Sequence, residues 1–111
     1  MILLSLKNVK LVGINEKYLS RHYCLTPQYR QQKEQWGWEF LKNRPKCWDK
    51  DKPRSVRITL WTYKDIDSVC KCVLDAANGV IWTDDKQLTE MIVWKNLIKR
   101  GSPEAIEVEV E

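Results

Sequence analysis

The chain has 111 residues, of which 43% are hydrophobic and 31% charged, a composition that argues against disorder and fits one soluble domain with a modest core. It contains no run of 18 apolar residues, and the short apolar start Met1–Leu6 lacks the basic flank of a signal peptide. We therefore expect a single cytoplasmic domain over residues 1–111, with no membrane partner.

The charge is divided between the two halves of the chain. The net charge is +4, but residues 1–64 hold 14 Lys and Arg against 5 Asp and Glu, whereas residues 65–111 hold 5 against 10. This division fits a surface for a polyanion beside a pocket for a cation. An unevenly charged, solvated surface would give the same counts.

The four cysteines do not form a metal or disulfide pattern. Cys70 and Cys72 are two residues apart on a predicted helix, so their side chains diverge by about 200°. There is no C-x2-C pair, and His22 is the only histidine. We expect reduced thiols.

The first half of the chain predicts a strand, a helix and a basic loop. A strand covers Ile2–Leu6, with apolar residues extending it toward Val12. Residues 13–26 mix basic and aromatic side chains, which fits either contact with nucleic acid or a packed loop. Thr26 and Pro27 form a helix start, and the helix ends near Asn43 because a proline follows shortly. Residues 42–54 form a basic loop that we expect to be mobile.

The second half predicts one helix and three strands. Ser55–Tyr63 alternates apolar and polar residues, a helix follows at once, and Asn78 with Gly79 ends it. Leu88–Ile98 and Ala105–Glu111 are the last two strands. The expected fold is α+β in the order β-α-β-α-β-β, a mixed sheet of about four strands with two helices packed on it.

Five carboxylates and a lysine surround the second predicted helix. Carboxylates that converge repel one another unless a cation lies between them, and oxygen ligands without histidine or thiolate favour Mg²⁺ or Mn²⁺. Asp65 and Asp67 lie where a strand ends and a helix begins. Asp84 and Asp85 follow the helix closely enough for at least one of them to fold back beside it. The set is Asp65, Asp67, Lys71, Asp75, Asp84 and Asp85.

A structural interpretation explains the same residues. Asp67 can cap the helix, and Asp67, Lys71 and Asp75 can form an i, i+4 ladder that contributes a few tenths of a kcal/mol per pair. Asp84 and Asp85 can belong to a turn. Spacing alone leaves both interpretations open.

The motifs of this region resemble the signature of the RusA family of Holliday-junction resolvases. The segments read D-I-D-S-V-C-K from Asp65, L-D-A from Leu74 and W-T-D-D-K-Q from Trp82. The family signature reads D-[LI]-D-N-x-x-K, then D-[AG]-L, then W-x-D-D-x-Q. Asn15-x-x-Tyr18 and Tyr29-Arg30 resemble the amino-terminal pattern of the family more weakly.

The resemblance implies the chemistry and the residues that perform it. By position, Asp65, Asp67 and Asp85 match the catalytic metal-site aspartates, Lys71 matches the essential lysine, and Asp84 matches a neighbouring acid that we include among the metal ligands. The chain departs from the pattern at Ser68, where asparagine is usual, and keeps only Lys64 of a basic run before the first aspartate. The lack of the basic run bears on the affinity for DNA rather than on the chemistry.

The implied function is an Mg²⁺-dependent endodeoxyribonuclease that resolves four-way (Holliday) junctions by paired symmetric nicks in DNA recombination and repair. Two symmetric cuts need two sites, so we expect a C2 homodimer in a bacterial or phage-infected cell. The alternatives are a non-catalytic nucleic-acid-binding module and a nuclease for other branched DNA.

Overall fold

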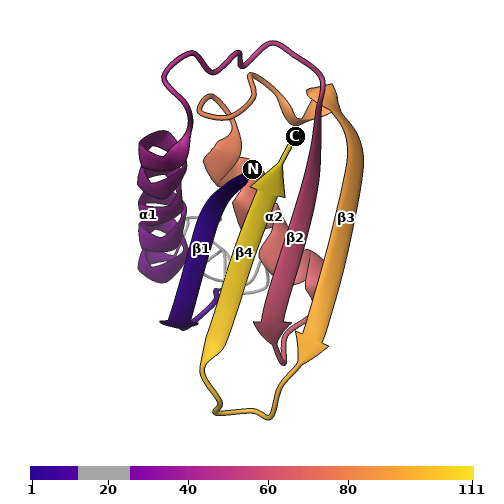
Figure 1. The fold of residues 1–111 in the computed structure, drawn as a ribbon. Coiled ribbons are helices and arrows are strands. Elements are labelled where there is room, and N and C mark those ends of the chain that lie inside the picture. Colours follow the sequence, from indigo (N-terminus) through magenta and orange to yellow (C-terminus); the bar gives the residue numbers. More distant parts are fainter. Residues whose placement is uncertain (13–25) are drawn as a thin grey trace.

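The computed structural model describes residues 1–12 and 26–111, and these residues form one mixed sheet with two helices (Figure 1). The spatial order of the strands is β1-β4-β2-β3, in which β2 is parallel to β3, and β4 is antiparallel to both β1 and β2. This arrangement confirms the predicted fold and element order. The elements are β1 (Ile2–Val9), α1 (Pro27–Asn43), β2 (Arg54–Thr62), α2 (Ile66–Ala77), the 3-10 helix η2 (Asp85–Gln87), β3 (Leu88–Leu97) and β4 (Glu104–Val110).

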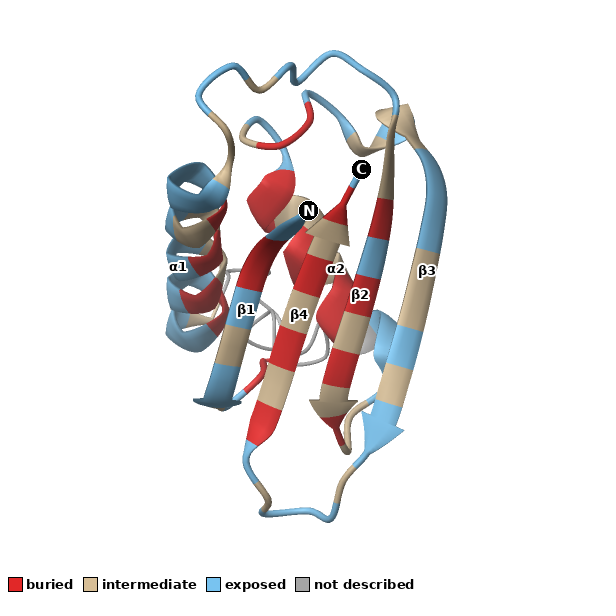
Figure 2. Cartoon of the chain, viewed as in Figure 1, coloured by how far each residue is buried: buried red, intermediate tan, exposed pale blue. Residues whose placement is uncertain are grey.

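Strict alternation along the central strands builds the core. In β2 the side chains of Val56, Ile58 and Leu60 are buried, and in β4 every second residue from Glu104 to Val110 is buried. Successive residues of a strand point to opposite faces, so one face of the sheet carries the core. Figure 2 shows the resulting bands of buried and less buried residues along both strands. In this view α2 lies behind the sheet, while the front face carries no helix in the described part of the chain.

Helix α1 begins and ends where the sequence predicts. The hydroxyl of Thr26 accepts a hydrogen bond from the backbone N–H of Tyr29 at 3.2 Å, Pro27 occupies the first helical turn, and Arg44 is already extended before Pro45. The helix buries Tyr29, Gln32, Trp36 and Phe40 at spacings of three and four residues and packs against α2 and β1.

Helix α2 is buried on a wide arc. Val69, Cys72, Val73 and Ala76 are buried, whereas Ile66 is 41% exposed. The arc is wide because α2 contacts α1 as well as contributing to the core over the sheet. The described cysteines Cys47, Cys70 and Cys72 are free thiols. None of the helices in the described ranges is long and apolar enough to cross a membrane.

The basic loop after α1 makes specific contacts with the rest of the fold. The indole N–H of Trp48 donates to the carbonyl of Ile81 at 2.7 Å, and Arg44 donates to the carbonyl of Val80 at 2.7 Å. The guanidinium of Arg54 lies 3.8 Å from the centroid of the Trp48 ring. These contacts hold the loop against the connection between α2 and β3.

A buried carboxylate ties three parts of the chain together at the other end of the sheet. Glu104 is 3% exposed and lies at the start of β4. Its carboxylate accepts hydrogen bonds from the backbone N–H of Leu11 at 3.0 Å and from the hydroxyl of Thr62 at 2.6 Å, and it pairs with the ammonium of Lys64 at 3.6 Å. Lys64 also donates to the carbonyl of Leu11. Lys64 therefore faces the interior and is not an exposed contact for DNA.

We predict that Glu104→Ala lowers the free energy of unfolding by about 3 kcal/mol, because it leaves the nearly buried ammonium of Lys64 without its carboxylate. The matched control is Glu107→Ala, on the same strand but on the face without helices, which should cost under about 0.5 kcal/mol. Urea denaturation followed by circular dichroism measures both values. Equal losses for the two variants would contradict this role of Glu104.

Candidate active site

The first acidic pair lies at the start of α2, where β2 has just ended. Asp65 occupies the N-cap position with an extended backbone (φ −68°, ψ 142°), and Asp67 lies in the first turn. Both residues are exposed. The positive end of the helix dipole favours carboxylates at this position, so the helix stabilises both charges without burying them.

The second acidic pair, Asp84 and Asp85, lies at the start of η2. The carboxylate of Asp84 accepts from the backbone N–H of Lys86 at 2.9 Å, and the side chain of Gln87 accepts from the backbone N–H of Asp84 at 2.9 Å, which forms a capping box. The hydrogen bond from the backbone N–H of Lys86 holds the pKa of Asp84 below its usual range. Asp84 is therefore kept ionised in a fixed position beside Asp85.

The two acidic pairs lie at opposite ends of the sheet. Arg54 pairs with Leu88 and Thr62 pairs with Leu97, so η2 lies near the start of β2 and Asp65 lies beyond its end. Nine residues of β2 span about 26 Å. Accordingly, no three Asp, Glu, His or Cys side chains in residues 1–12 and 26–111 are placed to hold a metal ion.

Within one chain, Asp84 and Asp85 follow the end of α2 and do not lie beside Asp65 and Asp67 at its start. The physical reason is the parallel pairing of β2 and β3. A parallel strand must begin at the end of the sheet where its neighbour begins, so the connection after α2 returns the chain to the far end. The pattern of strand, helix and strand from Ser55 to Ile98 was the sequence signal for this crossover. The role of these aspartates stays a prediction.

Lys71 and Asp75 form an ion pair on α2 that extends to α1. The ammonium of Lys71 lies 3.2 Å from one carboxylate oxygen of Asp75, and the hydroxyl of Tyr29 donates to the other at 2.5 Å. The side chain of Asp75 is 16% exposed and that of Lys71 is 40% exposed. Burial, together with the hydrogen bond to Asp75, raises the pKa of Tyr29, so its hydroxyl stays a proton donor.

The contacts of Lys71 and Asp75 differ in how far they leave each side chain available to a substrate. Asp75 is engaged by two groups of its own fold, and this position is typical of a residue that holds a neighbour rather than a substrate. Lys71 stays accessible while Asp75 restricts its position. Sequence reasoning missed Tyr29 as the partner, although a buried tyrosine hydroxyl usually finds an acceptor. The weak amino-terminal match at Asn15 and Tyr18 lies outside the described residues.

A comparison with protein families identifies the chain. The model of the endodeoxyribonuclease RusA family matches residues 16–111. The chain belongs to the RusA family. It is therefore an endodeoxyribonuclease, a hydrolase of a family that acts on Holliday junctions and generally depends on a divalent metal. A search of curated proteins finds no match to this chain.

Membership of the RusA family decides between the classes of function that the sequence left open. It favours the enzyme over a binding module, because the matched region includes α2, η2 and both acidic pairs. It also confirms the resemblance drawn from the D-I-D and W-T-D-D segments.

We predict that Lys71→Ala lowers the rate of junction cleavage at least about a hundredfold, because an ammonium that stabilises developing charge on a phosphate contributes at this level. Loss of the ion pair alone should cost under about 1 kcal/mol of stability, since the pair is partly exposed. Single-turnover cleavage and thermal unfolding measure the two effects. Near wild-type cleavage by this variant would leave Lys71 only its structural role.

Proposed function

We propose that the protein is an Mg²⁺-dependent resolvase that nicks two strands of a four-way DNA junction symmetrically. The observation that carries this proposal is the pair of acidic clusters, at Asp65 with Asp67 and at Asp84 with Asp85, in a chain of the RusA family. Carboxylate oxygens without histidine or thiolate fit a hard cation such as Mg²⁺, with Mn²⁺ as the substitute. Its place of action is the cytoplasm of a bacterial or phage-infected cell, where its DNA substrate is found.

We further propose that the active form is a homodimer in which each metal site draws one acidic pair from each subunit. One subunit keeps its two pairs about 26 Å apart along β2. A two-fold axis beside β3, perpendicular to the strands and level with the middle of β2, reverses the strand direction in the second copy. The Asp65 end of one copy then meets the Asp85 end of the other. The same axis creates two equal sites, as two symmetric cuts require.

The outer strand of the sheet offers a surface for this second copy. Strand β3 pairs only with β2 within the described chain, and it exposes Met91 (40%), Trp94 (63%) and Leu97 (76%). A long apolar edge strand is a template for pairing with another chain. Pairing across this edge would cover these side chains and place opposite ends of the two sheets side by side.

In the proposed site, the aspartates bind the cation and Lys71 contacts the phosphate. Asp65 and Asp67 from one subunit, with Asp84 and Asp85 from the other, would hold the cation. The bound cation would activate a water and offset charge on the scissile phosphate. Lys71, held by Asp75, would donate to a phosphate oxygen or to the leaving oxygen.

We predict that changing Asp65, Asp67 or Asp85 to Asn abolishes Mg²⁺-dependent nicking while junction binding in EDTA survives or tightens. Each change removes a ligand charge but keeps the size of the side chain, and binding depends on cationic contacts with phosphates. Gel shift and nicking on one four-way junction measure both properties, with linear duplex and flap DNA as substrate controls. Asp75→Asn, outside the proposed ligand set, should have a milder effect.

Normal nicking by the Asn variants would refute the metal site. Binding without nicking by the wild type, in Mg²⁺ and in Mn²⁺, would refute resolution. Stronger cleavage of flaps than of junctions would replace the junction by another branched DNA as the substrate.

Subunit mixing tests the shared site directly. We predict that Asp65→Asn/Asp67→Asn and Asp84→Asn/Asp85→Asn proteins are each inactive, whereas a mixture of the two regains nicking. A mixed dimer then has one intact site and one site without any ligand pair, so it should cut one strand of the junction and not two. Sites contained within single subunits would give no activity in the mixture.

We predict that sedimentation equilibrium gives a dimer, with about twice the 13.2 kDa mass of one chain. Trp94→Lys/Leu97→Lys should convert this dimer to a monomer, because two buried charges oppose the contact across β3. Trp38→Lys on α1 is the matched control, since Trp38 is 65% exposed on another element. A monomer throughout, with and without junction DNA, would refute the dimer.

A further inference from the structure

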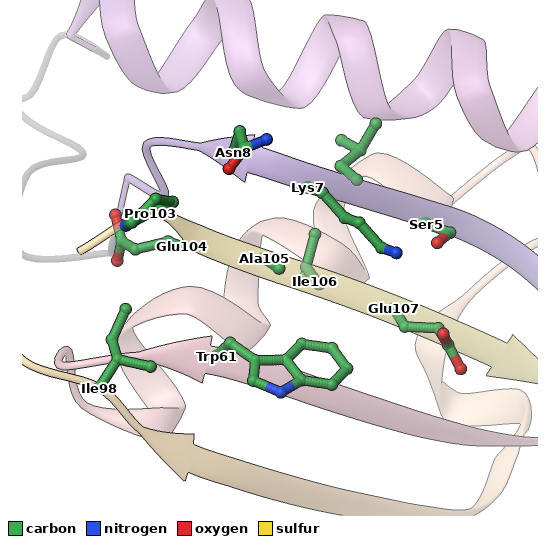
Figure 3. Close-up of a pocket in the computed structure, with 11 residues that line it drawn as sticks. Ser5, Lys7, Asn8, Trp61, Ile98, Pro103, Glu104, Ala105, Ile106 and Glu107 are labelled. Carbon is green, nitrogen blue, oxygen red and sulfur yellow. The ribbon is translucent and has the colours of Figure 1, made fainter.

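A groove crosses the face of the sheet that carries no helix (Figure 3). It has a volume of about 420 Å³ and runs across β4 between β1 and the end of β2. The indole of Trp61 forms one wall, Ile98 and Pro103 close one end, and the short side chain of Ala105 forms the floor. Its charged lining residues are Lys7, Glu107 and Glu104, and the last of these is paired with Lys64.

A second hollow of about 420 Å³ continues the first past Asn8 and Pro103, which line both. Its walls include Tyr63 and Lys10, and the guanidinium of Arg100 lies 5.7 Å from the centroid of the Tyr63 ring. The two hollows thus line up two aromatic rings with exposed cations beside them. Trp61 and Tyr63 are two residues apart.

This groove opens beside the first acidic pair. Tyr63 precedes Asp65 by two residues, so the two Cα atoms are at most about 7 Å apart. The intervening Lys64 is fixed by its ion pair with Glu104. Glu104 also lines both hollows. A DNA strand that passes the Asp65 end of the molecule would therefore lie close to the groove.

The side chains of the groove match the chemistry of an unpaired nucleotide. Aromatic rings can stack bases while neighbouring cations contact phosphates. Trp61 and Tyr63 are such rings, and Lys7 and Lys10 are the lysines that line the two hollows. The carboxylate of Glu107 can accept from an exocyclic amine, as carboxylates do from cytosine. We propose that this groove holds unpaired nucleobases of branched DNA, with Trp61 as a stacking surface. This inference rests on the proposed function and extends it to the recognition of the branch.

The test is the affinity for single-stranded and duplex DNA of one sequence, measured in EDTA by fluorescence anisotropy with labelled oligonucleotides of about ten nucleotides. Trp61→Leu should weaken single-strand binding at least about fivefold, the effect of losing one stacked base, and duplex binding less than about twofold. Trp61→Phe keeps a ring and should retain most of the single-strand affinity. Trp38→Leu, on the exposed face of α1, should change neither.

A second variant, Ala105→Leu, tests the groove without changing Trp61. Ala105→Leu fills the floor and should likewise weaken single-strand binding with duplex binding retained, so the proposal stays testable if Trp61→Leu does not fold. Equal single-strand affinities for wild type, Ala105→Leu and any folded Trp61 variant would overturn it. Conversion of a dimer to a monomer by Trp61→Leu, with single-strand affinity unchanged, would also overturn it and assign this face to a second copy. Since no step here needs metal or nicking, junction cleavage by the same proteins reports separately on the proposed function.

Discussion

The buried carboxylate of Glu104 determines how one end of the molecule is assembled. It joins the chain after β1, the end of β2 and the start of β4 through Leu11, Thr62 and Lys64. A carboxylate that is 3% exposed is tolerated only where hydrogen bonds and an opposite charge replace its water. Because Lys64 immediately precedes Asp65, this contact also fixes where α2 begins and where the first acidic pair is displayed.

Most of the fold followed from local patterns. The alternation in Ser55–Tyr63 and Ala105–Glu111 predicts strands whose inward residues the structure buries, and Thr26 with Pro27 predicts a helix start that the structure confirms by a capping hydrogen bond. Such signals succeed because neighbours in sequence determine them. Lys64 shows the limit, since its charge suggested DNA while its partner Glu104 lies 40 residues away.

Candidate residues for the site could be proposed from sequence, but their relative placement could not. The spacing of Asp65, Asp67 and Lys71 is local, so their common origin at the start of α2 was predictable. The position of Asp85 depends on which strand β3 joins and in which direction, and this is decided by burial of the whole sheet. Tyr29 illustrates the same point: its bond to Asp75 depends on how α1 packs against α2.

The parallel pairing of β2 and β3 has a consequence for how activity would be controlled. In the proposed dimer, the length of β2 sets the separation of the two sites, so the spacing of the cuts is built into the core and not into a flexible loop. In that dimer neither subunit would hold a complete site, so the population of active sites would follow the dimer, which mass action depletes at low protein concentration. A junction that contacts both subunits favours the dimer by the same linkage, and the substrate thereby promotes assembly of the site that cuts it.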